Sequence, residues 1–497
     1  MNLYNLLEKN SRLQVSILQA LLKESHSLRI SEMMADLSLT RFLFDNNVCE
    51  LQEVLKTLDL PLALKLDRKK DRIFLEKAEN ADLSLLYYYY LEHSVEYQIL
   101  NYLFQHPNNS VIKLGKQLLI SEAAVYRHIA RLNQYLQEFD LKIQQGKLVG
   151  DGLQICHFYY QLFWTGQPQQ VILEKTQDPS IQRFIDYLGR KLGTPFTQTN
   201  ILKLRLLIQI IKTCATKQDE QTKILEKFTN GQQLDPLYLT IKNAIFQATS
   251  HMALFVSDYQ AIYLYLFMSS SFLLPPAMKL TEESNYWRTY NPDIVPLNDL
   301  VVTLVKEEYQ INQADVSKDF IDEWKYYLTQ LNSYLYYFKG NITYFDESDI
   351  LATMTATTLG QPNEVLGQQI LDATEKMIGR PLSQDTRRMA LRYHLFFIDQ
   401  MRQFSRFSIK VGVLCNSGYL NERVMIASIQ NALAQKYFIT CEVAQLGSTY
   451  PILVTDSAYE ARHYSYQDLH VTHTLMTKRD LAELDQLMKK HSHTKKE

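Results

Sequence analysis

The stretch Val111–Asp151 reads VIKLGKQLLISEAAVYRHIARLNQYLQEFDLKIQQGKLVGD and is the part of the chain that decides the fold. Its first part, Val111–Leu119, has the length and composition of a short helix. Residues 120–122 form a predicted turn. Ser121 is a good N-cap, because its hydroxyl can accept a hydrogen bond from an early amide of the following helix. The pattern therefore predicts two helices joined by a tight turn.

The second predicted helix has one apolar and one polar face. Its apolar residues recur at helical spacing and are Val125, Ile129, Leu132 and Leu136. The opposite face carries Ala123, Tyr126, Arg127 and Gln134, with Arg131 nearer its edge. Two short strands, Leu141–Gln144 and Lys147–Val149, follow around a Gln-Gly turn. Two helices and a hairpin in this order predict a winged helix-turn-helix.

A helix of this kind fits the DNA major groove, where the side chains of its first turns meet the base edges. Candidate DNA-reading residues are Glu122, Ala123, Ala124, Tyr126, Arg127 and Arg131. Candidate phosphate contacts flank that helix and are Lys113, Lys116 and Lys147. The net charge of the chain is only −2, so its overall charge gives no argument for nucleic acid, but this stretch is locally basic. Short helix pairs also occur in helical bundles that bind no DNA.

The residue strings themselves resemble a known family. Leu119-Ile120-Ser121, Val125–Ile129, Leu132-Asn133 and Phe139–Leu141 are similar to the Mga-type helix-turn-helix. That family consists of regulators of Gram-positive bacteria that control virulence and metabolic genes, and AtxA-like regulators are among its relatives. The resemblance implies a DNA-binding transcriptional regulator, an activator of such genes, whose partner is double-stranded DNA.

A second helix-turn-helix candidate precedes the first. Helices are predicted at Arg12–Glu24, Ser31–Leu37 and Phe42–Leu58, with Thr40 as an N-cap. A hairpin follows, and the turn at its tip carries Arg68, Lys69 and Lys70, which could contact phosphates as a wing. The alternative is a solvated charged turn. We therefore predict a winged domain with a lesser role in reading sequence.

Few glycines (15) and prolines (13) among 497 residues predict a mainly α multidomain chain. The resemblance extends the prediction to two helical modules similar to phosphotransferase-system regulation domains and to a small C-terminal α/β domain similar to EIIB. The expected domains are two winged helix-turn-helix domains at 1–80 and 81–165, regulation domains at 166–282 and 283–405, and the EIIB-like domain at 406–497.

Three residues are candidates for phosphoryl chemistry. Cys415 follows the first C-terminal strand, where EIIB enzymes carry a phosphorylated cysteine, but Tyr419-Leu420-Asn421 replaces the expected small and hydroxyl residues. The alternative is an ordinary buried cysteine. His251 and His394 lie in the two helical modules, which in such regulators are phosphorylated by phosphotransferase-system phosphocarrier proteins. The alternative for both is a structural, hydrogen-bonded histidine.

Other signals are negative. No P-loop, zinc-protease, metal-spaced cysteine or esterase motif occurs, so we expect no enzyme, metal or cofactor. No signal peptide or membrane span is predicted, which indicates a cytoplasmic chain. A homodimer or higher oligomer through the C-terminal domain is expected, since two half-sites raise DNA affinity. The rival hypotheses are a phosphotransferase component that uses Cys415 and a helical protein-interaction scaffold.

Overall fold

The structure is a computed structural model, and it describes most of the chain. The described residues are 1–23, 27–107, 109–193, 195–214, 236–252, 258–274, 293–312, 316–345, 360–402, 404, 409–416, 418–434, 437, 439–472 and 476–493. Within these ranges the side chains of 236, 248–252, 258, 360–362, 492 and 493 are not described.

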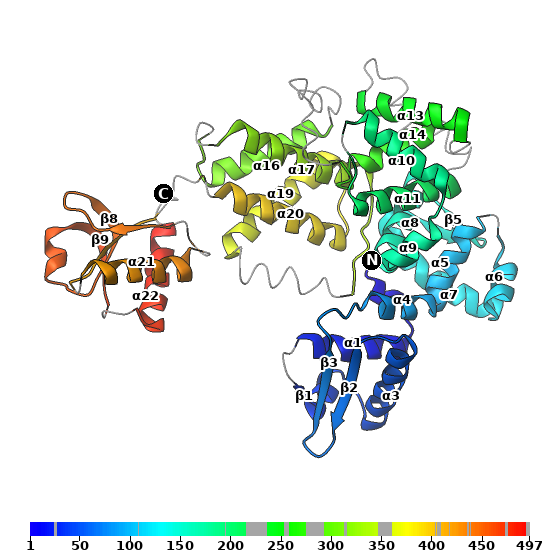
Figure 1. Cartoon of the computed structure of the whole chain (residues 1–497), viewed down its shortest axis with the longest axis horizontal. Coiled ribbons are helices and arrows are strands. Elements are labelled where there is room, and N and C mark those ends of the chain that lie inside the picture. The colour runs from blue at the N-terminus through cyan, green and yellow to red at the C-terminus, as the bar shows by residue number, and fades with distance from the viewer. Residues whose placement is uncertain are drawn as a thin grey trace. The chain divides into compact units, whose positions relative to one another are not determined.

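The chain divides into two units of contacting residues. The first comprises 1–295, 327–348 and 381–389, and the second comprises 296–326, 349–380 and 390–497. Helices dominate, and the strands of the described residues form three separate sheets, of which the C-terminal one is parallel (Figure 1). The predicted mainly α, multidomain class is confirmed. No helix within the described ranges is long and apolar enough to cross a membrane.

The N-terminal part combines three helices with a three-stranded antiparallel sheet. Its elements are a 3₁₀ turn η1 (Leu3–Leu6), α1 (Lys9–Lys23), β1 (Ser27–Arg29), α2 (Ile30–Asp36), α3 (Arg41–Thr57), β2 (Leu62–Asp67) and β3 (Arg72–Lys77). The sheet order is β1-β3-β2. Thr40 accepts a hydrogen bond from the Leu43 amide, which confirms it as the N-cap of α3. The predicted helices form, but α1 begins at Lys9, and β1 was not predicted.

Two helices rich in tyrosine follow, α4 (Ser84–Glu92) and α5 (Val95–Gln105). Three of the four consecutive tyrosines are buried, namely Tyr87, Tyr88 and Tyr90. The Tyr90 hydroxyl donates to Gln14 of α1 at 2.7 Å. These rings therefore pack in the core of the first unit.

The stretch quoted first forms α6 (Val111–Leu118), α7 (Glu122–Leu136), a 3₁₀ turn η2 (Gln137–Phe139), β4 (Lys142–Gln144) and β5 (Lys147–Val149). Its helix pair and hairpin match the predicted order and nearly the predicted bounds. The two strands pair antiparallel, with Gln144 opposite Lys147.

The middle of the chain is helical. In the first unit it contains α8 (Gly152–Gly166), α9 (Gln169–Lys175), α10 (Pro179–Lys191), α11 (Gln198–Cys214), α13 (Pro236–Met252) and α14 (Asp258–Met268). The helices α16 (Val295–Glu308), α17 (Lys318–Tyr337), α19 (Gly360–Ile378) and α20 (Gln384–Arg402) follow. The helical character that was expected for the middle of the chain is therefore present in its described residues. The division at 282 lies outside the described residues and stays a prediction, as do the other domain boundaries.

The C-terminal part is a four-stranded parallel sheet with helices. Its elements are β6 (Ile409–Leu414), α21 (Tyr419–Leu433), β7 (Ile439–Val443), β8 (Thr449–Thr455), a 3₁₀ turn η6 (Glu460–His463), β9 (Ser465–Val471) and α22 (Lys478–His493). The strand order is β7-β6-β8-β9. Both α21 and α22 contribute buried residues to one cluster with β6 and β8, through Met425 and Leu484 among others. The predicted α/β arrangement is confirmed, and all three strand pairs are parallel.

Candidate nucleic-acid interface

The turn between α6 and α7 is tight, and its residues explain why. Leu119 adopts a left-handed conformation (φ 56°) that ends α6, and the Ile120 amide then donates to the Gly115 carbonyl at 3.0 Å. Ser121 accepts from the Ala124 amide at 3.2 Å, so it is the predicted N-cap of α7. A Cβ atom at Gly115 would lie 3.0 Å from the Ile120 carbonyl oxygen. A glycine at this position therefore lets the two helices approach closely.

The helix α7 separates its apolar residues from its candidate DNA-reading residues. The predicted stripe is buried throughout and consists of Val125, Ile129, Leu132 and Leu136. On the other side Glu122, Ala123, Tyr126 and Arg127 are exposed, Tyr126 by 59%, while Ala124 is half-buried. Among the described residues the Arg127 side chain has no hydrogen-bond or ion-pair partner. The first two turns of α7 thus present a free guanidinium and an exposed phenol ring to solvent.

Arg131 differs from Arg127, because its guanidinium has a partner within the domain. Its guanidinium forms an ion pair with Glu96 of α5, whose side chain is fully buried. His128 contacts the same carboxylate through Nδ1 at 2.8 Å, while burial lowers the pKa of His128. Arg131 therefore ties α7 to α5 and compensates a buried charge. Its predicted contact with DNA stays a prediction.

The hairpin after α7 is fixed in place by two features. Gln145 and Gly146 both have positive φ, which gives the tight two-residue turn of a hairpin. A Cβ atom on Gly146 would lie 2.8 Å from the backbone of Ser110 and Val111, so the turn packs against the start of α6. Asn133 of α7 holds the strand β4, because its side chain donates to the Ile143 carbonyl at 3.1 Å and accepts from the Ile143 amide at 2.6 Å.

Three predicted phosphate contacts surround α7. Lys113 and Lys116 are exposed on α6, and Lys147 is exposed at the start of β5. Within the described part of the chain, none of their ammonium groups has an acidic partner. The helix α7, the hairpin β4–β5 and these three lysines therefore form a surface, which we call the α7–wing surface, with positive charge that is not neutralised internally.

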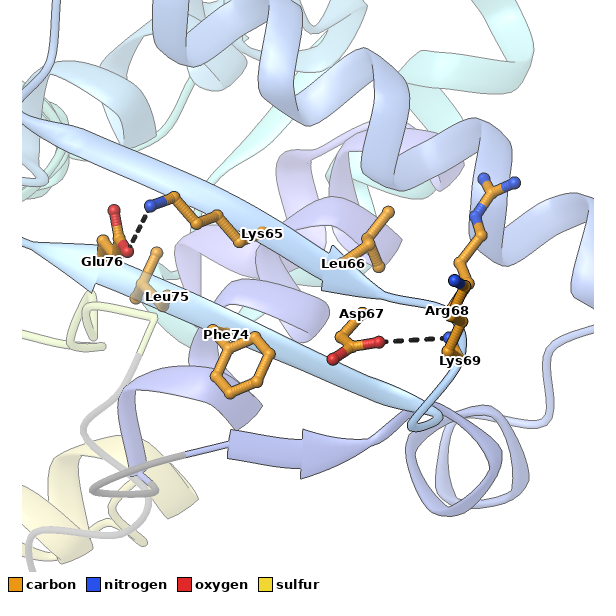
Figure 2. Close-up of a pocket in the computed structure, with 8 residues that line it drawn as sticks. All are labelled: Lys65, Leu66, Asp67, Arg68, Lys69, Phe74, Leu75 and Glu76. Carbon is orange, nitrogen blue, oxygen red and sulfur yellow. Dashed lines mark hydrogen bonds and ion pairs between the residues drawn. The ribbon is translucent and has the colours of Figure 1, made fainter.

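The first hairpin carries its positive charges in a different way. Figure 2 shows Lys65 paired with Glu76 across β2 and β3, and Asp67 accepting from the Lys69 amide beside an open groove. Arg68 lies 3.5 Å from Asp45 of α3, and Lys70 lies 3.9 Å from Asp67. The exposed Lys69 has no acidic partner among the described residues. Nearby acids thus offset much of the charge that would attract phosphate.

Cys415 lies in an acidic environment. Its thiol donates to the Asp456 carboxylate at 3.0 Å, and Asp456 also accepts from the Asn416 amide at 2.7 Å. The buried Glu422 carboxylate accepts from the Cys415 amide at 3.3 Å. Carboxylates thus stand where an anion-binding loop needs free amides, and they disfavour both a thiolate and a phosphoryl group there.

The two candidate histidines have different surroundings. His251 lies in α13, and its side chain is outside the described residues. His394 is fully buried in α20, and neither ring nitrogen has a hydrogen-bond partner within the described residues. Burial lowers the pKa of His394 to about 4, so the ring is neutral near pH 7. The alternative interpretation of His394 as a hydrogen-bonded structural histidine therefore finds no support among the described residues.

Comparison with known proteins agrees with the geometry of this surface. Residues 79–163 match the Mga helix-turn-helix domain, a range that runs from α4 to most of α8. A protein of Streptococcus pneumoniae serotype 4, described as a proposed trans-acting regulator, is 20% identical over 162 residues. That alignment covers 32% of this chain and 32% of the relative, so the chain spans about a third of its relative's length. The chain therefore carries a Mga helix-turn-helix domain and is similar to the Mga-like family of regulators.

Proposed function

We propose that this chain is a cytoplasmic DNA-binding transcriptional regulator that uses the α7–wing surface to read double-stranded DNA. The observation that carries the proposal is the exposed first half of α7, where Arg127 has no partner among the described residues. A guanidinium there can bond bidentately to a guanine edge in the major groove. The match of residues 79–163 to a helix-turn-helix domain supports the same use of this surface.

The same comparison of charges ranks the two helix-turn-helix units. In the second winged domain Lys113, Lys116 and Lys147 are free to contact phosphates, whereas in the first winged domain acids offset the charges of Arg68 and Lys70. We therefore assign sequence reading to the second winged domain. The first would add a supporting contact through the Arg68–Lys70 turn. We further propose that the regulator activates virulence or metabolic genes in a Gram-positive bacterium.

Replacing Lys113, Lys116 or Lys147 singly by alanine is expected to weaken binding to all DNA sequences alike. Each ammonium that contacts a phosphate releases about one counterion, so each substitution should reduce the slope of log K against log salt by about one unit. Fluorescence anisotropy titrations from low to moderate salt measure this slope. Lys376→Ala, at an exposed position of α19, is the matched control and should leave it unchanged. A loss confined to one DNA sequence would instead show that the lysine reads bases.

The proposal includes a route by which the helical middle reaches the winged domain. The segment after α17 packs behind that domain, where Lys339 lies 2.7 Å from Asp140. The Gln154 side chain binds the Tyr337 carbonyl and the Lys339 amide at 2.8 and 2.9 Å. A movement of α17 would therefore be transmitted to the residues that follow the recognition helix α7. Phosphorylation of His251 or His394 by phosphocarrier proteins is the proposed input, and at the buried His394 it requires local opening.

We also propose that the C-terminal domain forms the oligomer contact. Exposed apolar side chains follow several of its strands: Tyr419 (84%) and Leu420 (77%) after β6, Leu446 (72%) after β7 and Tyr459 (70%) after β8. Because the carboxyl ends of parallel strands meet at one edge of a sheet, these side chains share that edge. An exposed apolar edge is suited to pairing with a second copy.

Leu420→Asp is expected to shift the full-length chain toward monomer, because the carboxylate would have to be buried in the proposed contact. Specific DNA binding should weaken as well, since a second half-site no longer comes tethered. Sedimentation at equal concentrations measures the association state. Asn431→Asp, an exposed position at the other end of α21, is the control and should behave as wild type. An unchanged association state of Leu420→Asp would place the oligomer contact elsewhere.

The rival enzyme hypothesis has less support. A phosphoryl carrier at Cys415 would need anion-binding amides, and Asp456 and Glu422 already occupy two of them. Incubation of the full-length chain with radiolabelled phosphoenolpyruvate and the general phosphotransferase proteins distinguishes the cases. Label on a histidine agrees with the proposed regulation, and label on Cys415 would support the rival.

A further inference from the structure

Three potential metal ligands converge between β9 and α22 of the C-terminal domain. His470 lies near the end of β9, and Asp480 and Glu483 lie in the first two turns of α22. One ligand atom from each lies within 4.8 Å of the other two. The His470 side chain is only 6% exposed, and its Nε2 has no hydrogen-bond partner in the described part of the chain. A buried, unpartnered nitrogen facing carboxylates is costly unless something bridges them.

The spacing of these atoms suits a shared cation better than direct hydrogen bonds. Nε2 of His470 lies 3.6 Å from Oδ1 of Asp480, and Nδ1 lies 4.0 Å from Oε2 of Glu483. Both distances exceed the roughly 2.7–3.2 Å of a hydrogen bond. Ligands about 2.0–2.2 Å from a tetrahedral Zn²⁺ stand roughly 3.3–3.6 Å apart. An imidazole binds one ion through one nitrogen, and the 3.6 Å between Nε2 and Oδ1 of Asp480 lies in this range. One ligand atom of each of the three residues lies within 4.8 Å of the others, so a small adjustment of the Glu483 side chain would complete the set.

Neighbouring groups orient both carboxylates toward the histidine. The amide and hydroxyl of Thr477 donate to Oδ2 of Asp480 at 2.7 and 2.5 Å. Nε of Arg479 donates to Oε1 of Glu483 at 2.9 Å. Each acid thus has one oxygen held by a donor and the other turned to His470. Outer partners that fix a ligand in this way are typical of metal sites.

We propose that His470, Asp480 and Glu483 bind one divalent transition-metal cation of the Zn²⁺ class. Imidazole with two carboxylates suits Zn²⁺, Mn²⁺ or Fe²⁺, and it is too nitrogen-rich for the all-oxygen sites that Ca²⁺ and Mg²⁺ prefer. The three ligands leave one tetrahedral position for water or another donor. The ion would join the edge strand β9 to α22, so its binding would stabilise the C-terminal domain. The site departs from the sequence-based expectation of no metal.

Zinc titration of the full-length chain against a competing chromophoric chelator tests the proposal. Wild type should bind one more equivalent of Zn²⁺ than His470→Gln, and the affinity of that equivalent should fall by more than about 100-fold, beyond the usual loss for an outer partner. His491→Gln is the matched control, because His491 joins the same two elements through Asp468 at 2.6 Å. It should bind zinc as wild type does. Equal stoichiometry and affinity in His470→Gln and wild type would overturn the proposal.

A second measurement distinguishes metal bound at this site from metal bound by any of the five cysteines, and from a loss of folding in the variant. Co²⁺ bound at this site should show a ligand-field spectrum without a thiolate charge-transfer band, and this spectrum should disappear in Asp480→Asn. Zn²⁺ should raise the thermal midpoint of wild type but not of Asp480→Asn. An equal rise in both proteins, or a wild-type Co²⁺ spectrum with thiolate character alone, would also overturn the assignment, as would a wild-type chain that takes up no metal.

Discussion

Replacing Arg131 by methionine is expected to destabilise the second winged domain by about 3–5 kcal/mol. Methionine keeps the length and apolar stem of the side chain but removes the charge that compensates the buried Glu96 carboxylate. The domains of this chain need not unfold together, so a single global unfolding transition would not report the stability of the second winged domain. Hydrogen exchange of peptides from α5 and α7 measures the local effect, and it should accelerate by about 10²–10⁴-fold.

Two controls separate the buried charge from packing. The double variant Glu96→Leu with Arg131→Met removes both charges, and it should recover most of the lost protection. The burial of His128 lowers its pKa, so the ring is neutral near pH 7 and cannot replace Arg131 there. As the pH is lowered, the imidazolium forms and pairs with Glu96, so the defect of Arg131→Met should shrink with falling pH. A defect that does not change with pH, or no defect, would contradict this account of the cluster.

Arg127→Ala is expected to cost about 1–3 kcal/mol in binding to the best DNA site and to relax the choice of base at one position. The side chain lies on the exposed face of α7 with no internal ion pair among the described residues, so its loss should leave the fold intact. Competition titrations with single-base variants of the best site measure the discrimination. Gln134→Ala is the control, because Gln134 is exposed on the same helix beyond its first turns. Unchanged base discrimination in Arg127→Ala would remove this residue from the reading surface.

Local patterns in the sequence were sufficient to predict the helix-turn-helix. The caps Thr40 and Ser121 and the buried stripe of α7 depend on neighbours within a few residues, and all appear where the pattern predicts. The strand β1 was not predictable in this way. Its three residues form a strand only because they pair with β3, as Ser27 does with Phe74, more than forty residues along the chain. Local propensity contains no information about such a partner.

The features that hold the surface in place were also beyond the sequence. In the sequence, Glu96 is one acidic residue on a predicted amphipathic helix. It gains Arg131 and His128 as partners only because α5 packs against α7. Asn133 belongs to one of the sequence segments that resemble the Mga-type helix-turn-helix. Its two hydrogen bonds to the Ile143 backbone, however, depend on the path of the hairpin. The cluster at His470 has no motif spacing, because a strand and a helix supply its members.

The most direct measurement is a titration of the full-length chain with genomic fragments of its source organism, in the presence of excess random DNA. The account predicts that a few fragments bind at least about 10³-fold more tightly than random sequence, in the range of specific regulators. It also predicts that Arg127→Ala reduces this preference by about 5- to 150-fold, the equivalent of about 1–3 kcal/mol, while the salt-dependent binding to random DNA remains. Equal affinity of wild type for every fragment would contradict the claim that the α7–wing surface reads DNA.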